Sequence, residues 1–115
     1  MAATVTIAPI REGSLDAWRE FVAELRGERR IEWAQSQRRR GIARQVITLA
    51  VGDRELAVVY TEAGDVEAAA NLLVASDDPF DSWYSSRMEE LHDMPMETEV
   101  VFDSAPRPGP WRGRR

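Results

Sequence analysis

The sequence predicts an α+β fold in which strands and helices follow the order β-α-β-β-α-β. Three observations predict this fold. Short runs of alternating apolar residues, typical of strands, occur near the beginning, the middle and the end of the chain. Two longer segments between them carry apolar residues three and four positions apart, which is typical of amphipathic helices. The middle run, Gln45–Tyr60, contains Gly52 and Asp53, a pair that favours a tight hairpin turn.

The first strand is predicted at residues 4–10 and the first helix at residues 14–40. Ser14 can cap the helix, and Gly41 can end it. Gly27 is expected to weaken the helix in its middle. The run Arg38-Arg39-Arg40 lies at the helix C-terminus, where the helix dipole favours positive charge. The apolar face of this helix is Leu15, Trp18, Phe21, Val22 and Leu25.

The hairpin is predicted to turn through two residues, Gly52 and Asp53. With that loop, Leu49 faces Leu56 and Ile47 faces Val58. The hairpin is apolar on both of its faces, whereas a strand with one face in water should alternate cleanly.

The second helical region is predicted as two pieces that bend near residues 76–79. Asp65 can cap the first piece. Asp78 can cap the second piece, with Pro79 at its first helical position. A last strand is predicted at residues 98–102.

This order of elements is the split βαβ, or ferredoxin-like, arrangement: a four-stranded antiparallel sheet with the helices on one face. The residues expected to meet the helices are Val5, Ile7, Ile47, Leu49, Leu56, Val58, Val100 and Phe102. The residues expected on the opposite face are Thr4, Thr6, Arg44, Val46, Thr48, Ala57, Val59, Thr61, Glu99 and Val101. Burying several β-branched groups of that opposite face would be favourable. We therefore expect a homodimer that pairs through the sheet face.

Composition limits the classes of partner and of chemistry. With 115 residues the chain has room for one domain, predicted at 1–105, followed by a flexible tail rich in Pro, Gly and Arg at 106–115. Without the four arginines of that tail, the net charge of −5 becomes −9, so nucleic acid is not expected as a partner. The chain has no cysteine, no lysine and no apolar run long enough to span a bilayer. A cytoplasmic location and no membrane partner are expected.

From about Val5 to Ser104 the chain resembles the dimeric α/β-barrel superfamily. Within it, the chain is similar to small uncharacterised bacterial proteins with a domain of unknown function. The resemblance rests on a long first helix, a tight central hairpin and the segment Asp78-Pro79-Phe80-Asp81-Ser82-Trp83. It implies a pocket between the sheet and the helices, which members use for cofactor-free oxygenation, haem breakdown, isomerisation or binding.

His92 and Tyr84 are the candidate catalytic residues. His92 is the single histidine, so it can titrate near neutral pH without a special environment. Its place late in the second helix resembles haem-degrading relatives, but the first strand lacks the asparagine that those relatives use, and no cofactor is predicted. Glu89 and His92 form one Glu-x-x-His without a second copy, so no metal is predicted.

Aromatic residues and one arginine are the candidate ligand-binding residues. Rings along the helices could line a small pocket or fill the core. An arginine near the open end of the hairpin could orient an anionic group or pair with Glu99 across a dimer. The candidates are Trp18, Trp33, Trp83, Tyr84, Arg44 and Tyr60.

Two hypotheses of function follow. In the first, the chain is a homodimeric module that binds a small molecule or another partner without catalysis. In the second, it is a cofactor-independent oxygenase, isomerase or cyclase that acts on a small aromatic substrate near Trp83, Tyr84 and His92. An enzyme needs a polar group placed inside the pocket at the reacting atom, which a binding module does not.

Overall fold

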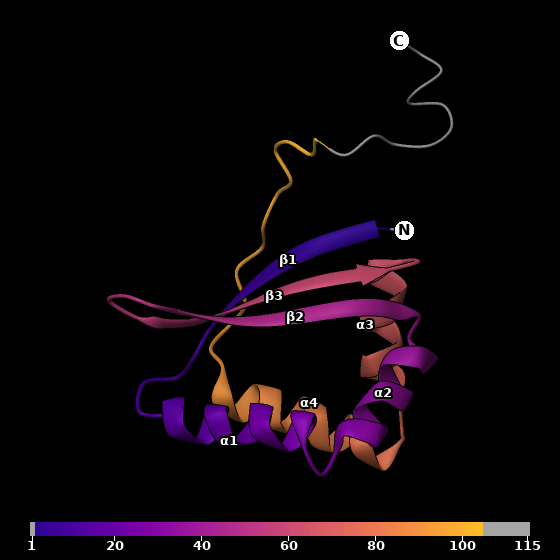
Figure 1. The fold of residues 1–115 in the computed structure, drawn as a ribbon, viewed down its shortest axis with the longest axis horizontal. Coiled ribbons are helices and arrows are strands. Elements are labelled where there is room, and N and C mark those ends of the chain that lie inside the picture. Colours follow the sequence, from indigo (N-terminus) through magenta and orange to yellow (C-terminus); the bar gives the residue numbers. More distant parts are fainter. Residues whose placement is uncertain (1, 105–115) are drawn as a thin grey trace.

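The computed structural model describes residues 2–104 (Figure 1). The predicted tail at 106–115 lies outside the described residues. None of the described helices is both long and apolar enough to cross a membrane. In chain order the elements are β1 (Ala2–Pro9), α1 (Leu15–Arg26), α2 (Arg30–Arg39), β2 (Ile42–Val51), β3 (Glu55–Ala63), α3 (Val66–Ala75) and α4 (Pro79–Leu91).

Most of the predicted helix ends are confirmed, but the first helix, predicted as one piece at residues 14–40, is two helices, and the predicted cap Ser14 makes no side-chain capping hydrogen bond. The long first helical region breaks at Gly27 into α1 and α2, and Gly41 follows α2 with a φ of +71°, which favours glycine. The Asp65 side chain accepts a hydrogen bond from Ala68 N, and Asp78 accepts from Phe80 N. Both aspartates therefore cap their helices as predicted.

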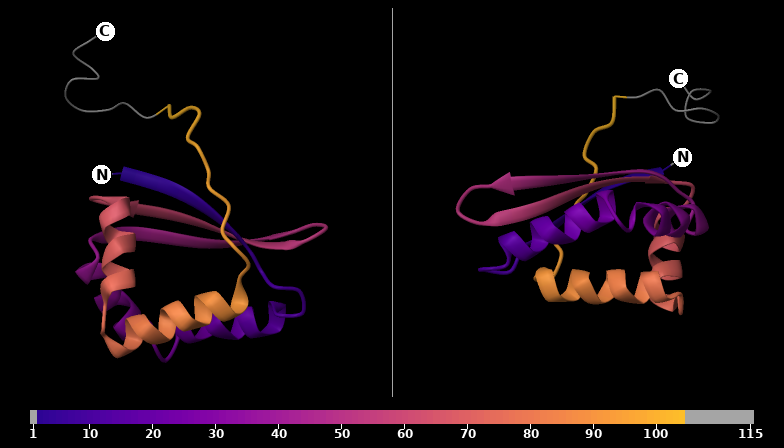
Figure 2. Two further views of the ribbon diagram at one scale, coloured as in Figure 1. Left: turned by 180° about the vertical axis from the view of Figure 1, so that it is seen from behind. Right: turned by 60° about the horizontal axis from the view of Figure 1, so that its bottom comes forward.

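The strands form an antiparallel sheet in the order β1-β3-β2. All four helices lie on the same side of this sheet: α1 and α4 form the layer beneath it, and α2 and α3 connect that layer to one end of the sheet (Figures 1 and 2). The α+β class and the helices on one face are confirmed. We call the side facing the helices the helix side of the sheet, and the other the outer face.

The predicted hairpin register is wrong by one residue. Val51 pairs with Glu55 and Leu49 pairs with Ala57, so the loop has three residues, 52–54. Because side chains alternate along a strand, a slip of one residue moves every side chain of β3 to the other face. The local Gly-Asp signal did not reveal the third loop residue.

In the observed register, most residues of β1 and β3 lie on the face of the sheet opposite to the predicted one. Ala8 and Ala57 belong to the core, with Ile47 and Leu49 packed against it, so the helix side carries these positions and their alternates. Of the residues predicted there, only Ile47 and Leu49 are confirmed among the three strands. The helix side is made of Thr4, Thr6, Ala8, Gln45, Ile47, Leu49, Ala57, Val59, Thr61 and Ala63. The outer face is made of Val5, Ile7, Arg44, Val46, Thr48, Leu56, Val58, Tyr60 and Glu62.

The predicted fourth strand at residues 98–102 is absent from the described part of the chain. Instead, the segment after α4 runs antiparallel along the free edge of β1, with isolated bridges from His92 to Ile10 and from Met96 to Ile7. Pro95 has no N–H to donate, so it interrupts a regular ladder between these bridges. The Thr98 hydroxyl donates to the Val5 carbonyl, after which the chain leaves the sheet past β1 (Figure 2).

The core is built mainly by aromatic and aliphatic side chains of the helices. Phe21 of α1 lies between Trp83 and Tyr84 of α4, with ring centroids 5.6 and 5.7 Å away. The fully or nearly buried members are Ala8, Ile10, Trp18, Phe21, Leu25, Ala57, Phe80, Tyr84 and Leu91. The strands contribute mostly small residues to this core, which leaves the large apolar groups of the sheet on the outer face.

Candidate functional site

The helix side of the sheet is polar at the end where α2 approaches β2. Thr4, Thr61 and Gln45 lie side by side in one row across the three strands. Gln37 of α2 donates to Gln45 Oε1 at 3.1 Å, and Gln45 Nε2 donates to the buried Thr61 hydroxyl at 3.1 Å. A hydrogen-bonded chain therefore crosses from the helix layer to the sheet.

Two side chains of α2 bring unused hydrogen-bond donors into this region. Trp33, Ser36 and Arg40 lie on one face of the helix because they are separated by three and four residues. Arg40 is only 8% exposed, yet its Nε and Nη2 atoms have no hydrogen-bond partner among the described residues. The buried indole Nε1 of Trp33 also has none. Buried donors normally find a partner, so this cluster is unusual.

The nearby carboxylate of Asp81 already accepts hydrogen bonds from three other donors. Ser36 donates to Oδ1 at 2.5 Å, and Ser76 and Arg39 donate to Oδ2 at 2.6 and 3.1 Å. Burial opposes the charge of Asp81, but these three hydrogen bonds outweigh it and lower the pKa of the carboxyl. The network fixes α2 to the start of α4 and leaves no hydrogen bond from Asp81 to Arg40.

Arg40 is therefore a buried cation without an ion-pair partner at contact distance. Its Cζ lies 6.0 Å from the centre of the Tyr84 ring. Burial lowers the pKa of Arg40. The electrostatic effects of Tyr84 and Asp81 raise it, but by less. Burial also raises the pKa of the Tyr84 hydroxyl, so Tyr84 is neutral at neutral pH. The Arg40 guanidinium can accept no hydrogen bond, but it can donate several to an anion.

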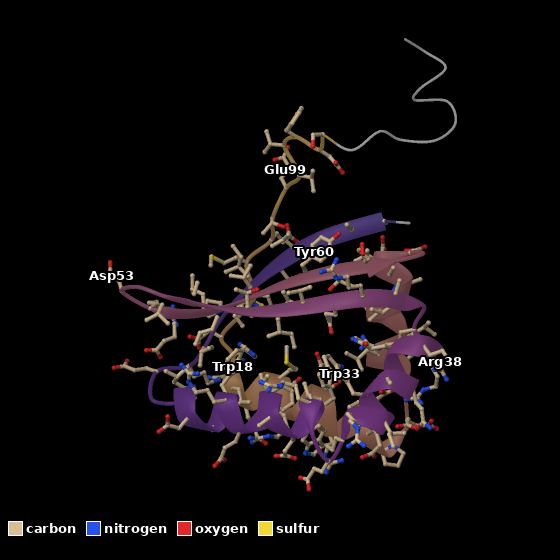
Figure 3. The ribbon with its side chains drawn as sticks, in the orientation of Figure 1. Trp18, Trp33, Arg38, Asp53, Tyr60 and Glu99 are labelled. Carbon is tan, nitrogen blue, oxygen red and sulfur yellow. The ribbon has the colours of Figure 1, made fainter. Side chains whose placement is uncertain are left out.

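The predicted aromatic residues of the helices lie on the helix side. Trp18 and Tyr84 are buried in the core, and Figure 3 shows Trp18 and Trp33 between the helices and the sheet. Trp83 is half-buried and packs against Phe21, and the guanidinium carbon of Arg29 lies 3.9 Å from its ring centre. Tyr84 thus lies beside Arg40, and Trp33 lies on the same face of α2 as Arg40, whereas Arg29 packs on the ring of Trp83.

Arg44 and Tyr60, the other predicted ligand residues, lie on the outer face, as the strand register shows. Figure 3 shows Tyr60 on the side of the sheet away from the helices. Arg44 faces Glu62 across the hairpin, and Tyr60 faces Val46. Partial desolvation and the neighbouring Glu62 raise the pKa of Tyr60. The predicted ligand residues therefore divide between two sides of the sheet and do not line one pocket.

His92 and Tyr84 are both buried, but the structure does not bring them together. His92 follows the last residue of α4, eight positions after Tyr84, which corresponds to about 12 Å along a helix axis. Burial lowers the pKa of His92, although the carbonyls of Pro9 and Ala8 oppose this effect. Its Nδ1 has no partner among the described residues. The two predicted catalytic side chains make no contact with each other.

One hollow on the described surface has a volume of about 790 Å³ and lies at the hairpin tip, next to the β1–α1 loop. Its arginines are already paired: Arg54 lies 2.7 Å and Arg11 3.8 Å from Asp93 carboxylate oxygens. Within residues 2–104 no group of three or more histidine, aspartate or glutamate side chains could hold a metal ion. The unpaired donors of α2 are therefore the stronger candidate site.

The sequence analysis did not single out Arg40. It interpreted the run Arg38-Arg39-Arg40 as one charged helix end, whereas Arg38 is exposed, Arg39 pairs with Asp81, and Arg40 is buried. The signal that could have found it is spacing: Arg40 follows Trp33 by seven residues and so lies on the same face of the helix.

Comparison with known proteins finds a solved structure of similar fold. A dimeric ferredoxin-like protein from an uncultured marine organism superposes with a TM-score of 0.61 and 12% sequence identity, over 91% of this chain and 100% of that chain. No family model matches the sequence, and no curated protein matches it significantly. Together with the strand order β1-β3-β2, this likeness shows that the chain has a ferredoxin-like fold.

Proposed function

We propose that the chain is a homodimeric module that pairs through the outer face of its sheet and binds a small molecule on the helix side. One observation carries this proposal: the distribution of side chains over the two faces of the sheet. On β1 and β3 the outer face holds Val5, Ile7, Leu56 and Val58, whereas the helix side of these two strands is mainly alanine and threonine; the large groups Ile47 and Leu49 on the helix side come from β2. A sheet that merely supported helices would show the reverse.

The size of the outer face supports pairing with a second copy. Three strands of eight to ten residues cover roughly 30 by 14 Å, or roughly 400 Å² in plane. A standard interface buries about 800 Å² per partner. Val100, Val101 and Phe102 follow the sheet edge and are 61, 90 and 83% exposed, so they offer further apolar surface. The solved structure of similar fold is itself described as dimeric.

The binding role is supported by the polar groups that the helix side leaves without partners. Leaving buried donors unsatisfied costs about 1–3 kcal/mol each. Arg40 and Trp33 together contribute three such nitrogen atoms. A bound small molecule that accepts hydrogen bonds would remove this cost.

Glutamate substitutions on the outer face test the dimer. Val46→Glu and Val58→Glu each place a charge on both copies within the proposed interface. Because unpaired buried charges are strongly disfavoured, we expect the dissociation constant of the dimer to rise at least about 100-fold. Val74→Glu on α3 is the matched control, because Val74 is 86% exposed and lies off the sheet. Sedimentation velocity at micromolar concentration measures the change.

A stable monomer of the unsubstituted protein at that concentration would contradict the proposed pairing. So would a dimer that is unaffected by both outer-face substitutions. Native mass spectrometry of the purified dimer tests the binding role separately, because a retained small molecule adds a defined mass to each subunit.

A further inference from the structure

We propose that Arg40 binds the carboxylate of a small organic acid between α2, α4 and the sheet, with Trp33 on the same face of α2. This inference rests on the proposed binding function and names the chemical class of the ligand. It begins from the donors that the fold leaves unused: Nε and Nη2 of Arg40 and Nε1 of Trp33, all buried and without partners among the described residues.

The geometry of the guanidinium selects a carboxylate. Nε and Nη2 form one edge of the planar group, and their N–H bonds point in the same direction. A carboxylate presents two oxygens at matching spacing, so it can accept both hydrogen bonds at once. Nε and Nη2 are the two unpaired buried nitrogens of Arg40, and they form the edge that suits a bidentate anion.

The surroundings favour an anion from outside the protein. Asp81, a carboxylate whose charge acts on Arg40, already accepts hydrogen bonds from Ser36, Ser76 and Arg39. A buried charge without a partner is strongly unfavourable, so a site of this kind is stable when an anion fills it. The sheet offers only small or uncharged groups at this end, with Thr61 and Gln45 hydrogen-bonded to each other.

The body of the acid is expected to be apolar and flat. Tyr84 lies beside Arg40, and its ring is in turn stacked with Phe80 at 6.1 Å and packed on Phe21 at 5.7 Å. Trp33 and Gln37 are partly exposed, so the position borders solvent along α2. Benzoate combines a carboxylate with an aromatic ring and serves as the probe.

The test follows the indole N–H resonances of the ¹⁵N-labelled full chain while benzoate is added at constant ionic strength in sodium chloride. The Trp33 resonance is assigned with Trp33→Phe. We expect a saturable shift of that resonance with benzoate and none with benzamide, which has the same ring without the charge. An equal response to benzamide, equally tight binding of inorganic phosphate, or no shift with 10 mM benzoate would overturn the proposal.

Substitutions of Arg40 give the second arm. Arg40→Gln is expected to weaken benzoate binding about 30-fold or more, because it removes the charged half of a buried pair. The variant should remain folded and gain stability without ligand, since a buried unpaired charge is lost. Arg40→Lys keeps the charge without the planar edge and should also bind weakly. Arg44→Gln, on the outer face, is the matched control and should bind as the unsubstituted protein does.

Undiminished benzoate binding by Arg40→Gln would refute the assignment. The result for the anion site can be separated from the result for the dimer, because Val58 lies on the outer face of the sheet. A monomeric Val58→Glu protein that still shows the benzoate shift would leave the anion site standing. An intact dimer without the shift would remove the anion site alone.

Discussion

Asp81→Asn tests whether the buried hydrogen-bond network holds α2 against α4, and with it the position of Arg40. Asp81 is 2% exposed and accepts hydrogen bonds from Ser36, Ser76 and Arg39. Each hydrogen bond to a buried charged group contributes about 1.5–3 kcal/mol. Arg39 is 43% exposed at its side chain, so its share is below about 1 kcal/mol.

The expected loss follows from these contributions. The two serine bonds sum to roughly 3–6 kcal/mol, and asparagine keeps one acceptor oxygen that recovers about 1 kcal/mol of it. We therefore expect Asp81→Asn to lower the free energy of unfolding by about 2–5 kcal/mol, a large part of the 5–15 kcal/mol typical of a domain. Ser36→Ala should cost about 1.5–3 kcal/mol and Arg39→Gln less than about 1 kcal/mol.

Urea unfolding followed by circular dichroism measures these changes. With a slope of about 1.5 kcal/mol per molar, Asp81→Asn should move the midpoint down by roughly 2 M. Protein concentration must be equal for all variants, because dimerisation would make the midpoint depend on it. A midpoint shift below about 0.5 M, or a larger loss for Arg39→Gln than for Ser36→Ala, would refute the assigned role of the network.

Three further predictions concern single positions. Burial lowers the pKa of His92 below its usual 6.5, so the unfolded state takes up the proton first as the pH drops. The free energy of unfolding should therefore fall between about pH 6.5 and the folded-state pKa. The urea midpoint of His92→Gln should lack this decline. Gly41→Ala should lower the free energy of unfolding by about 1–2 kcal/mol, measured by urea titration, because its φ is +71°. No atom lies within 4 Å of the added methyl, so the loss comes from the backbone conformation alone. Gly64→Ala, without a positive φ, should lower it by less. Asp65→Ala should lower the thermal midpoint through loss of about 1 kcal/mol of capping, and Ser14→Ala should leave it nearly unchanged, because Ser14 makes no capping hydrogen bond; equal effects would contradict the capping assignment.

The sequence by itself determined the features that local chemistry controls. Asp65, Asp78 with Pro79, and Gly41 act within a few residues of themselves, so the helix ends could be predicted from them. The alternation in β2 also predicted its two faces correctly. The low helix propensity of glycine predicted a weak point at Gly27, but not the full break into α1 and α2.

Only the tertiary structure decided the sheet register, its edge and the candidate site. A third loop residue moved Leu56 and Val58 to the outer face, because pairing between strands depends on packing that no local pattern contains. The chain after α4 forms isolated bridges with β1 and its end instead of a regular strand, because Pro95 interrupts the ladder. Arg40 looks like its exposed neighbour Arg38 in sequence, and only packing against α4 and the sheet buries it without a partner. Side-chain burial is a property of the assembled layers, and for this reason the residue most indicative of function was the one that the sequence did not reveal.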